Sequence, residues 1–197
     1  MSSYRVNMNS PKYSNMSSTK NVKGKNRKGV PKKHARQPQL SESGTAVTLK
    51  KVYTEKLQVY TDGGCMGNGF AGSTGSYAFV VVEDEKVLHE YSRSVQEETT
   101  NNRMELQAIT DAIQWLEEQG IEEPVRLFSD SEYCVKGLTR WIHGWRNKEF
   151  AGIKNPDMWL KLNELSIRNP QVQFTWVRGH GDNKWNCRAD ELCTAAL

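Results

Sequence analysis

The stretch Gln58–Gly69 reads QVYTDGGCMGNG, and its change of character at Asp62 decides how the rest of the chain is interpreted. Val59, Tyr60 and Thr61 are β-branched or aromatic and predict a strand, which we expect to end at the single carboxylate and the glycines after it. Three interpretations fit this pattern: a glycine loop that cradles phosphate, an ordinary strand-to-turn exit, or one quarter of a metal site.

The segment after Gly72 tests the glycine-loop interpretation. Gly67–Gly72 reads GNGFAG and satisfies the G-x-G-x-x-G spacing of dinucleotide-binding loops. Such a loop needs a helix N-terminus to receive the pyrophosphate. Here it runs into Ser76–Glu83 (SYAFVVVE), which predicts a strand, so the pattern favours a flexible connection between two strands.

The rest of the chain predicts an α/β fold. Strands are expected at Leu57–Thr61, Ser76–Glu83, Val87–Val95, Val125–Phe128 and Val172–Val177. Helices are expected at Asn102–Gln119, Glu132–Leu138, Thr139–Trp145, Asp157–Ile167 and Asn183–Ala196. The short connections between the first three strands indicate an antiparallel meander, and the whole order predicts a mixed sheet covered by helices.

Charge divides the chain into two parts. Residues 1–40 hold ten Lys or Arg and no acid, which leaves 17 basic and 23 acidic side chains for residues 41–197. We therefore expect residues 1–55 to form a basic, mostly disordered arm and residues 56–197 to form the folded domain. Eight positive side chains in Lys20–Arg36 favour nucleic-acid binding, with a nuclear-import signal and a solubilising tail as alternatives. A mitochondrial presequence is disfavoured because Lys exceeds Arg.

Membrane and secretory classes are not supported. No window approaches 18 uninterrupted apolar residues, and no charged segment followed by an apolar one opens the chain. The four cysteines form no C-x-x-C pair, which favours a reduced, intracellular protein. We expect a cytoplasmic location, or a nuclear one if the source is eukaryotic.

Four acidic residues, namely Asp62, Glu105, Asp130 and Asp190, are candidates for a functional site. Asp62 and Asp130 each follow an apolar run, and each alone is best explained as a turn residue. If their strands are neighbours, both project from one edge of the sheet, where ligand sites gather. Glu105 lies beside the apolar stripe of its helix, as does Asp190, although a carboxylate near a helix start also suits the helix dipole.

Four converging carboxylates would repel one another unless a cation neutralised them. Oxygen ligands suit Mg²⁺ or Mn²⁺ rather than Zn²⁺, and no His and Cys residues have zinc-site spacing. Two such ions about 3.5–4 Å apart would assist phosphoryl chemistry. The spacing permits this site without proving that the side chains converge.

Five motifs in order resemble those of the ribonuclease HI family. They are Tyr60–Cys65 (YTDGGC), Thr99–Leu106 (TTNNRMEL), Ser129–Ser131 (SDS), Trp176–His180 (WVRGH) and Arg188–Leu192 (RADEL). The resemblance covers about residues 57–197. It implies a ribonuclease H-like fold, with a five-stranded mixed sheet of three antiparallel strands and then two parallel ones, flanked by helices.

The resemblance also implies an activity, namely endonucleolytic hydrolysis of the RNA strand of RNA–DNA hybrids with two Mg²⁺ ions, or Mn²⁺, leaving 5′-phosphate and 3′-hydroxyl ends. By the same match, Asp62 would bridge both metals, Asp190 would complete one site, and Glu105 and Asp130 the other. His180 matches the family's mobile histidine, which assists proton movement or product departure.

Substrate contacts follow from the same resemblance. Residues matching the family's RNA minor-groove contacts are Cys65, Gly67 and Asn68, and those matching its DNA-phosphate pocket are Thr100 and Asn101, with Asn102 beside them. An aromatic and basic handle is matched by Trp141, Trp145, Arg146 and Lys148, although a core Trp pair with solvated charges is the alternative. Bacterial members of the family usually carry a Gln that contacts RNA at the position of Glu132, so the resemblance does not extend to that contact.

Two rival functions remain at this stage. A catalytically idle hybrid- or double-stranded-RNA-binding module would have no need of a repulsive carboxylate cluster. A related nuclease of the same fold with a broader substrate is disfavoured by Asn101–Leu106 and the minor-groove residues. We expect a monomer that binds RNA–DNA hybrid, with the basic arm adding affinity for nucleic acid and no membrane contact.

Overall fold

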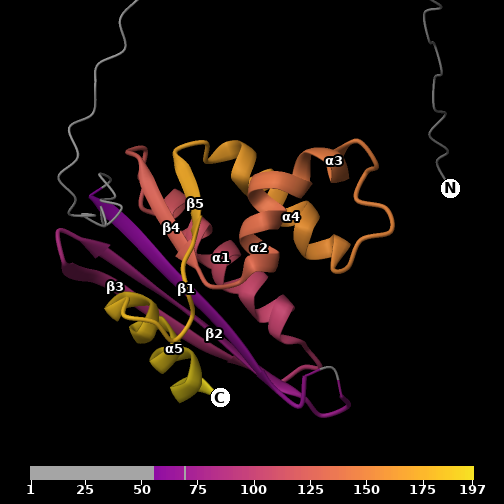
Figure 1. Cartoon of the computed structure of the whole chain (residues 1–197), viewed down its shortest axis with the longest axis horizontal. Helices are drawn as coiled ribbons and strands as arrows, with labels where there is room; N and C mark the ends of the chain where they lie inside the picture. The colour runs from indigo at the N-terminus through magenta and orange to yellow at the C-terminus, as the bar shows by residue number, and fades with distance from the viewer. Residues whose placement is uncertain (1–55, 69) are drawn as a thin grey trace, which may run out of the picture. The chain divides into compact units, whose positions relative to one another are not determined.

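Five strands form one mixed sheet in the order β3-β2-β1-β4-β5 (Figure 1). The computed structural model describes residues 56–68 and 70–197, so the predicted basic arm and Gly69 lie outside the described residues. Strands β1 (Leu57–Met66), β2 (Thr74–Glu83) and β3 (Lys86–Val95) pair antiparallel. Strands β4 (Val125–Ser129) and β5 (Val172–Trp176) continue the sheet in parallel with β1. The predicted sheet is confirmed.

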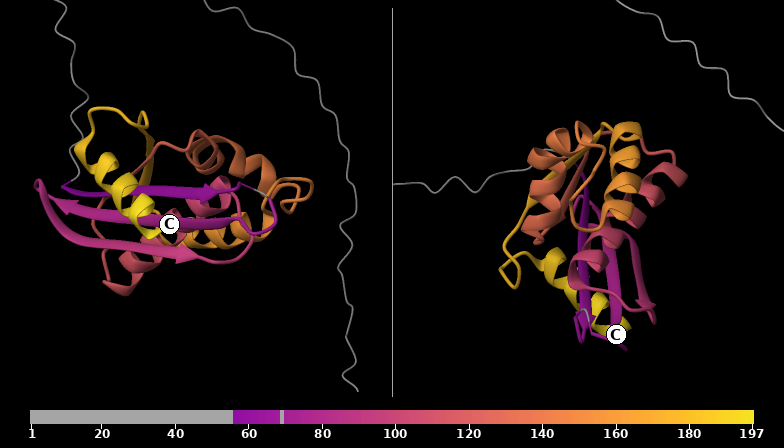
Figure 2. Two further views of the ribbon diagram at one scale, coloured as in Figure 1. Left: turned by 90° about the horizontal axis from the view of Figure 1, so that it is seen from below. Right: turned by 90° about the vertical axis from the view of Figure 1, so that its right-hand side faces the viewer.

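Helices cover both faces of this sheet (Figure 2). One face carries α1 (Asn101–Glu118), α4 (Pro156–Arg168) and a continuous helical stretch of α2 (Glu132–Lys136), the π-helical turn η1 (Gly137–Trp141) and α3 (Ile142–Arg146). The other face carries α5 (Lys184–Ala196), whose Ala189 packs among buried side chains of β1, β2 and β4. The sheet thus lies between a large helical layer and a single helix.

Helix α1 is the central support of the larger layer. The Thr100 hydroxyl caps its start by accepting from the Arg103 amide at 3.3 Å. Its apolar residues recur at three-to-four spacing and are buried against the sheet: Met104, Ala108, Ile109, Ala112, Ile113 and Leu116. This packing fixes the rotation of α1 and therefore the direction of every other side chain on it.

The first strand is longer than predicted. We expected it to end at Thr61, but β1 continues through the glycines to Met66, which pairs with Thr74 of β2. Glycine is poor at forming strands alone, yet the ladder to β2 extends this one. The ladder to β4 does stop early, at the pair Thr61 and Ser129. The next residues, Asp62 and Asp130, therefore stand side by side just beyond the last parallel pair.

Candidate active site

Three carboxylates meet at this edge of the sheet. One ligand oxygen from each of Asp62, Glu105 and Asp130 lies within 4.8 Å of the others. Asp62 comes from β1, Asp130 directly follows β4, and Glu105 reaches in from α1. Residues that are distant in the sequence are thus brought into one group by strand pairing and by the packing of one helix.

A glycine allows the helix to come this close. A Cβ atom added to Gly63 would lie 2.3 Å from the backbone carbon of Met104 and 2.3 Å from the backbone nitrogen of Glu105. Because no side chain fits in that space, the backbones of β1 and α1 touch here. The glycine after Asp62 therefore sets the distance between Asp62 and Glu105.

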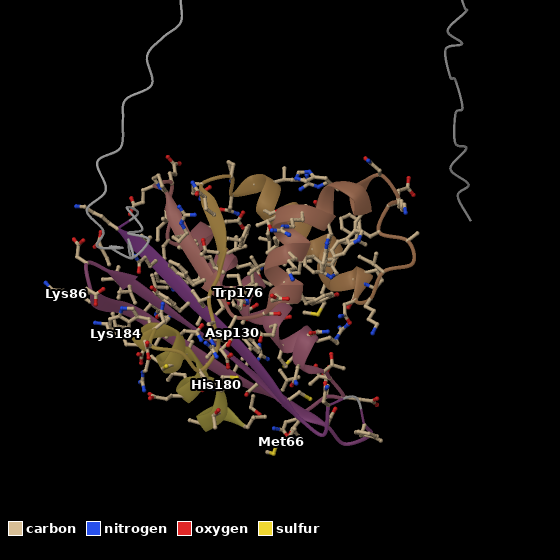
Figure 3. All side chains as sticks on the ribbon, in the orientation of Figure 1. Met66, Lys86, Asp130, Trp176, His180 and Lys184 are labelled. Atoms are coloured by element: carbon tan, nitrogen blue, oxygen red, sulfur yellow. The ribbon has the colours of Figure 1, made fainter. Side chains whose placement is uncertain are left out.

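The loop after β5 approaches the third carboxylate in the same way. A Cβ atom on Gly179 would lie 2.4 Å from Oδ2 of Asp130, and the Trp176 indole donates to the Asp130 carbonyl at 3.0 Å. Figure 3 shows Trp176, Asp130 and His180 near one another over the middle of the sheet, with Met66 at the far end of β1. Trp176 and Gly179 thus hold the backbone and the carboxylate of Asp130 from one side.

Electrostatics in this group are unfavourable without a cation. Burial, and then the Asp130 charge, raise the pKa of Asp62 from 3.8 to about 6. Burial also raises the pKa of Glu105 well above 4.5, with the charges of Asp62 and Asp130 acting in the same direction. Asp62 and Glu105 therefore both resist ionisation, because they are buried beside groups of the same charge.

The donor set fits a divalent cation. Oε2 of Glu105 is fully enclosed and has no hydrogen-bond partner in the described part of the chain, although the residue as a whole is only half-buried. An enclosed carboxylate oxygen without a donor needs a cation or a proton. Carboxylate oxygens are the ligands that Mg²⁺ and Mn²⁺ prefer. The residues present are thus suited to a hard divalent ion.

Asp190 and His180 stand beside this group rather than inside it. Asp190 of α5 is not one of the three carboxylates that meet within 4.8 Å, but its charge acts on Asp62. Its Oδ2 lies 3.6 Å from Nδ1 of His180, whose side chain is 87% exposed. His180 has a φ of 49° and lines a cavity of about 670 Å³ formed by residues 176–183. The imidazole of His180 is therefore exposed to solvent beside Asp190.

The predicted RNA and phosphate contacts lie together at the start of α1. Oδ1 of Asn68 accepts from the amide of Asn101 at 3.0 Å, and the thiol of Cys65 donates to the carbonyl of Thr99. These two bonds fasten the β1–β2 turn, which Gly67 enters at a φ of +71°, to the helix start. These residues therefore lie together, and their binding to RNA and to a DNA phosphate stays a prediction.

Lys154 and Asn155 also belong to this surface at the start of α1, although the sequence did not indicate them. A cavity of about 500 Å³ is lined by Asn68, Thr100, Asn101, Asn102, Lys154 and Asn155. Lys154 and Asn155 directly precede α4, and they bring a positive charge and an amide to the N-terminus of α1. In the sequence, Asn155 and Pro156 indicate only that a helix begins there. They do not indicate that this helix start faces the N-terminus of α1.

The aromatic handle is partly exposed. Trp141 is 39% exposed, so the alternative that it belongs to the core is wrong. Trp145 is half-buried and lies 4.9 Å, centroid to centroid, from Trp159, which is the fully buried indole of this region. Arg146 donates from Nε to Asn163 of α4, which directs its guanidinium toward that helix.

Comparison with known proteins gives the family. The RNase H family model matches residues 54–197. The chain belongs to the ribonuclease H family. A ribonuclease H from Caulobacter sp. (strain K31) is 41% identical over 149 residues, covering 73% of this chain and 91% of the relative. The ribonuclease H of Aromatoleum aromaticum is 37% identical over 144 residues, covering 71% of this chain and 88% of the relative.

Solved structures agree with the fold of this ribonuclease H. LC9-RNase H1, described as a type 1 RNase H with the type 2 active-site motif, matches with a TM-score of 0.63 and 30% identity over 71% of each chain. LC11-RNase H1, solved in complex with RNA/DNA hybrid, matches with a TM-score of 0.56 and 26% identity over 72% of this chain and 96% of that one. Ribonucleases H are metal-dependent enzymes, and the acidic group of Asp62, Glu105 and Asp130 is this chain's candidate metal site.

Proposed function

We propose that this ribonuclease H cleaves the RNA strand of RNA–DNA hybrids endonucleolytically, leaving 5′-phosphate and 3′-hydroxyl ends. The observation that carries the proposal is the meeting of Asp62, Glu105 and Asp130 within 4.8 Å, with one buried oxygen unpaired. Its relatives support the substrate, because LC11-RNase H1 was solved with RNA/DNA hybrid. A protein that only bound hybrid would be repelled by such a cluster, since phosphates and carboxylates carry the same charge.

The residues assigned to the metals are the four carboxylates. Asp62 would contact both ions, Glu105 and Asp130 would complete one site, and Asp190 would complete the other. We take Mg²⁺ as the natural ion, with Mn²⁺ as a substitute, because all donors are oxygens. When bound, two such ions supply an activated water and stabilise the leaving oxygen in phosphodiester hydrolysis.

The protein's own groups act around that site. Gly63 and the packing of α1 hold Glu105 against Asp62, and Trp176 holds the backbone at Asp130. Nδ1 of His180 lies 3.6 Å from Oδ2 of Asp190, and its exposed imidazole is placed to pass a proton between the site and solvent or a departing group. We assign His180 to proton transfer and product departure on that ground.

Recognition of the hybrid is assigned to the start of α1 and the turn before β2. Cys65, Gly67 and Asn68 would lie along the RNA minor groove, where 2′-hydroxyls distinguish RNA from DNA. Thr100, Asn101 and Asn102 line the cavity at the N-terminus of an 18-residue helix, a place that favours anions. Trp141, Trp145 and Arg146 would contact the DNA strand farther along, with Trp141 the more exposed of the two indoles.

The basic N-terminal segment is assigned to long-range attraction. Residues 41–197 carry a net charge of about −6, which repels a hybrid, whereas residues 1–40 carry ten positive side chains. We propose a domain boundary near residue 55, an arm that raises affinity without entering the chemistry, and a monomeric enzyme. The four free thiols agree with a reducing, cytoplasmic setting. None of the described helices is long and apolar enough to cross a membrane.

A panel of labelled duplexes tests the proposal. Full-length protein and Asp62→Asn are incubated with RNA–DNA hybrid, double-stranded RNA or double-stranded DNA, with Mg²⁺ or with EDTA. We expect only the wild type with Mg²⁺ to cut, and only the RNA of the hybrid. Binding without cutting would identify an idle binding module, and cutting of double-stranded RNA would identify a broader nuclease. Equal cutting by Asp62→Asn would refute the site.

A further inference from the structure

The turn between β1 and β2 carries the most exposed large apolar side chain among the described residues. Phe70 is 75% exposed and belongs to none of the three buried apolar clusters of the described domain. Met66, the last residue of β1, is 58% exposed at the same end of the sheet (Figure 3). Single apolar side chains are common on protein surfaces, so exposure alone does not define a site. What distinguishes Phe70 is that the turn carrying it is fixed.

Two tight turns hold the backbone of Phe70. Its amide donates to the Gly67 carbonyl at 2.8 Å, and its carbonyl accepts from the Ser73 amide at 3.0 Å. Both bonds use backbone groups, so the turns do not need the phenyl ring. The ring therefore points into solvent from a backbone of defined shape.

Residues on either side of Phe70 fasten the turn to the start of α1. The buried Ser73 hydroxyl accepts from the Thr99 amide at 3.0 Å and donates to the Thr99 carbonyl at 3.1 Å. On the other side, the Asn101 amide donates to Oδ1 of Asn68 at 3.0 Å. Thr99 and Asn101 lie at the N-terminus of α1. The ring of Phe70 is thus presented from a fixed position beside the helix start.

Nucleic acid is the partner that this position favours. Asn68 lines the cavity at the N-terminus of α1 together with Lys154, and a helix N-terminus with a lysine beside it suits a phosphate group. From Asp62 to Met66, β1 spans roughly 13 Å, or about four base-pair steps. One duplex can therefore reach the carboxylates and the turn together. A protein docked on Phe70 would compete with that duplex.

We propose that Phe70 packs into the minor groove of an RNA–DNA hybrid and favours hybrid over double-stranded DNA. A-form duplexes, which hybrids resemble, have a wide and shallow minor groove, whereas that of B-form DNA is about 6 Å wide. A phenyl ring enters the wider groove more easily. The contact is apolar and is made to sugars and base edges. This inference rests on the proposed function, because it takes the hybrid as the substrate.

The variants isolate the ring. Phe70→Ala removes it, and Phe70→Trp keeps an aromatic side chain. Leu88→Ala is the matched control, because Leu88 is 53% exposed on β3, and its neighbour Val87 pairs with Val82 at the end of β2 away from the turn. Substitutions at such exposed positions change stability little, so the melting temperature of all three should stay close to that of the wild type.

The readout is fluorescence anisotropy of labelled hybrid and of double-stranded DNA with the same sequence, titrated with the full chain in EDTA. We expect Phe70→Ala to weaken hybrid binding about 10-fold, as aromatic contacts to nucleic acid do, and Phe70→Trp to stay within about threefold. Binding of double-stranded DNA should change less than about twofold. The salt dependence of hybrid binding should be unchanged in Phe70→Ala, because the ring neutralises no phosphate.

Ser73→Ala tests whether the turn must hold the ring. It removes the acceptor of the Thr99 amide and the donor to the Thr99 carbonyl, so one of the two fastenings is lost. In this background we expect Phe70→Ala to weaken hybrid binding less than about threefold, because the effects of coupled residues do not add. Full additivity would refute a positioning role for the turn.

Hybrid binding by Phe70→Ala that equals the wild type overturns the inference, and a change in its sedimentation coefficient alone would assign the ring to a contact between copies. Equal weakening toward double-stranded DNA, a flatter salt dependence, or equal weakening by Leu88→Ala overturns it as well. A wild type that binds hybrid in EDTA but does not cut it with Mg²⁺ refutes only the proposed cleavage, and the Phe70 comparison still decides this inference.

Discussion

Replacing Asp62 by Asn should make the ion-free protein more stable at neutral pH while abolishing its activity. The pKa of Asp62 is raised from 3.8 to about 6, chiefly by burial, so the fold disfavours its charged form. At about 1.36 kcal/mol per pH unit, that rise corresponds to a penalty of about 3 kcal/mol at pH 7. Asn carries no charge and is of similar size, and it also lessens the repulsion on Glu105.

The pH dependence follows from the direction of the shift. A carboxyl whose folded pKa is raised contributes stability that is complete below pH 3.8 and is lost as the pH rises through about 6. The advantage of Asp62→Asn should therefore be largest above pH 6 and shrink toward pH 4. At about 2–4 °C per kcal/mol for a domain of this size, the melting temperature at pH 7 should rise by about 6–12 °C.

Thermal denaturation in EDTA at pH 4, 5, 6 and 7 measures this effect, with Glu123→Gln as a control at an exposed carboxyl. Adding Mg²⁺ should then stabilise the wild type but not Asp62→Asn, because only the wild type keeps the ligand. If Asp62→Asn at pH 7 melts no higher than Glu123→Gln, burial and the Asp130 charge do not destabilise the ionised form of Asp62 as the geometry requires.

Three further predictions concern the surroundings of the site. Gly179→Ala should weaken Mg²⁺ binding and cleavage with little change in melting temperature, since its Cβ would lie 2.4 Å from Oδ2 of Asp130; calorimetric titration with Mg²⁺ that matches the wild type would contradict this. Gly137→Ala should do the reverse, lowering stability by about 1–3 kcal/mol in urea denaturation because its Cβ would lie 2.1 Å from the buried ring of Trp159, while the protein that remains folded keeps its activity. Deletion of residues 1–55 should raise the KM for hybrid and flatten its salt dependence, by about 0.9 in the log–log slope for each phosphate that the arm neutralises, and an unchanged slope would exclude the arm from binding.

The sequence predicted the sheet, and it placed Asp62 and Asp130 at one edge on the condition that their strands are neighbours, which the structure shows. Alternating and apolar runs indicate strands, and parallel neighbours end at a common edge. The true end of β1 could not be predicted, because the strand propensity of Gly63 and Gly64 is low and only the ladder to β2 extends the strand over them.

The contacts that the sequence did not predict join residues that are far apart in the chain. The residues around Cys193 in the sequence do not indicate that it contacts Ser76, which lies more than one hundred residues earlier in the chain. Lys154 likewise reaches the cavity at the start of α1 only because α4 packs beside that helix. Trp141 and Trp159 look alike as aromatic residues in helices, and only packing decides that the second is the buried one.

If a divalent-cation site built around Glu105 cuts the RNA of a hybrid, cleavage must depend on both the ion and the Glu105 carboxylate. Single-turnover cleavage of an end-labelled hybrid is followed against Mg²⁺ concentration for the wild type and for Glu105→Gln, which keeps the volume of the buried side chain. We predict that EDTA abolishes wild-type cleavage, that excess Mg²⁺ restores it, and that Glu105→Gln cuts at least about 100-fold more slowly while melting no lower than the wild type. Cleavage in EDTA, or a Glu105→Gln rate equal to that of the wild type, would show that no cation held by Glu105 performs the reaction.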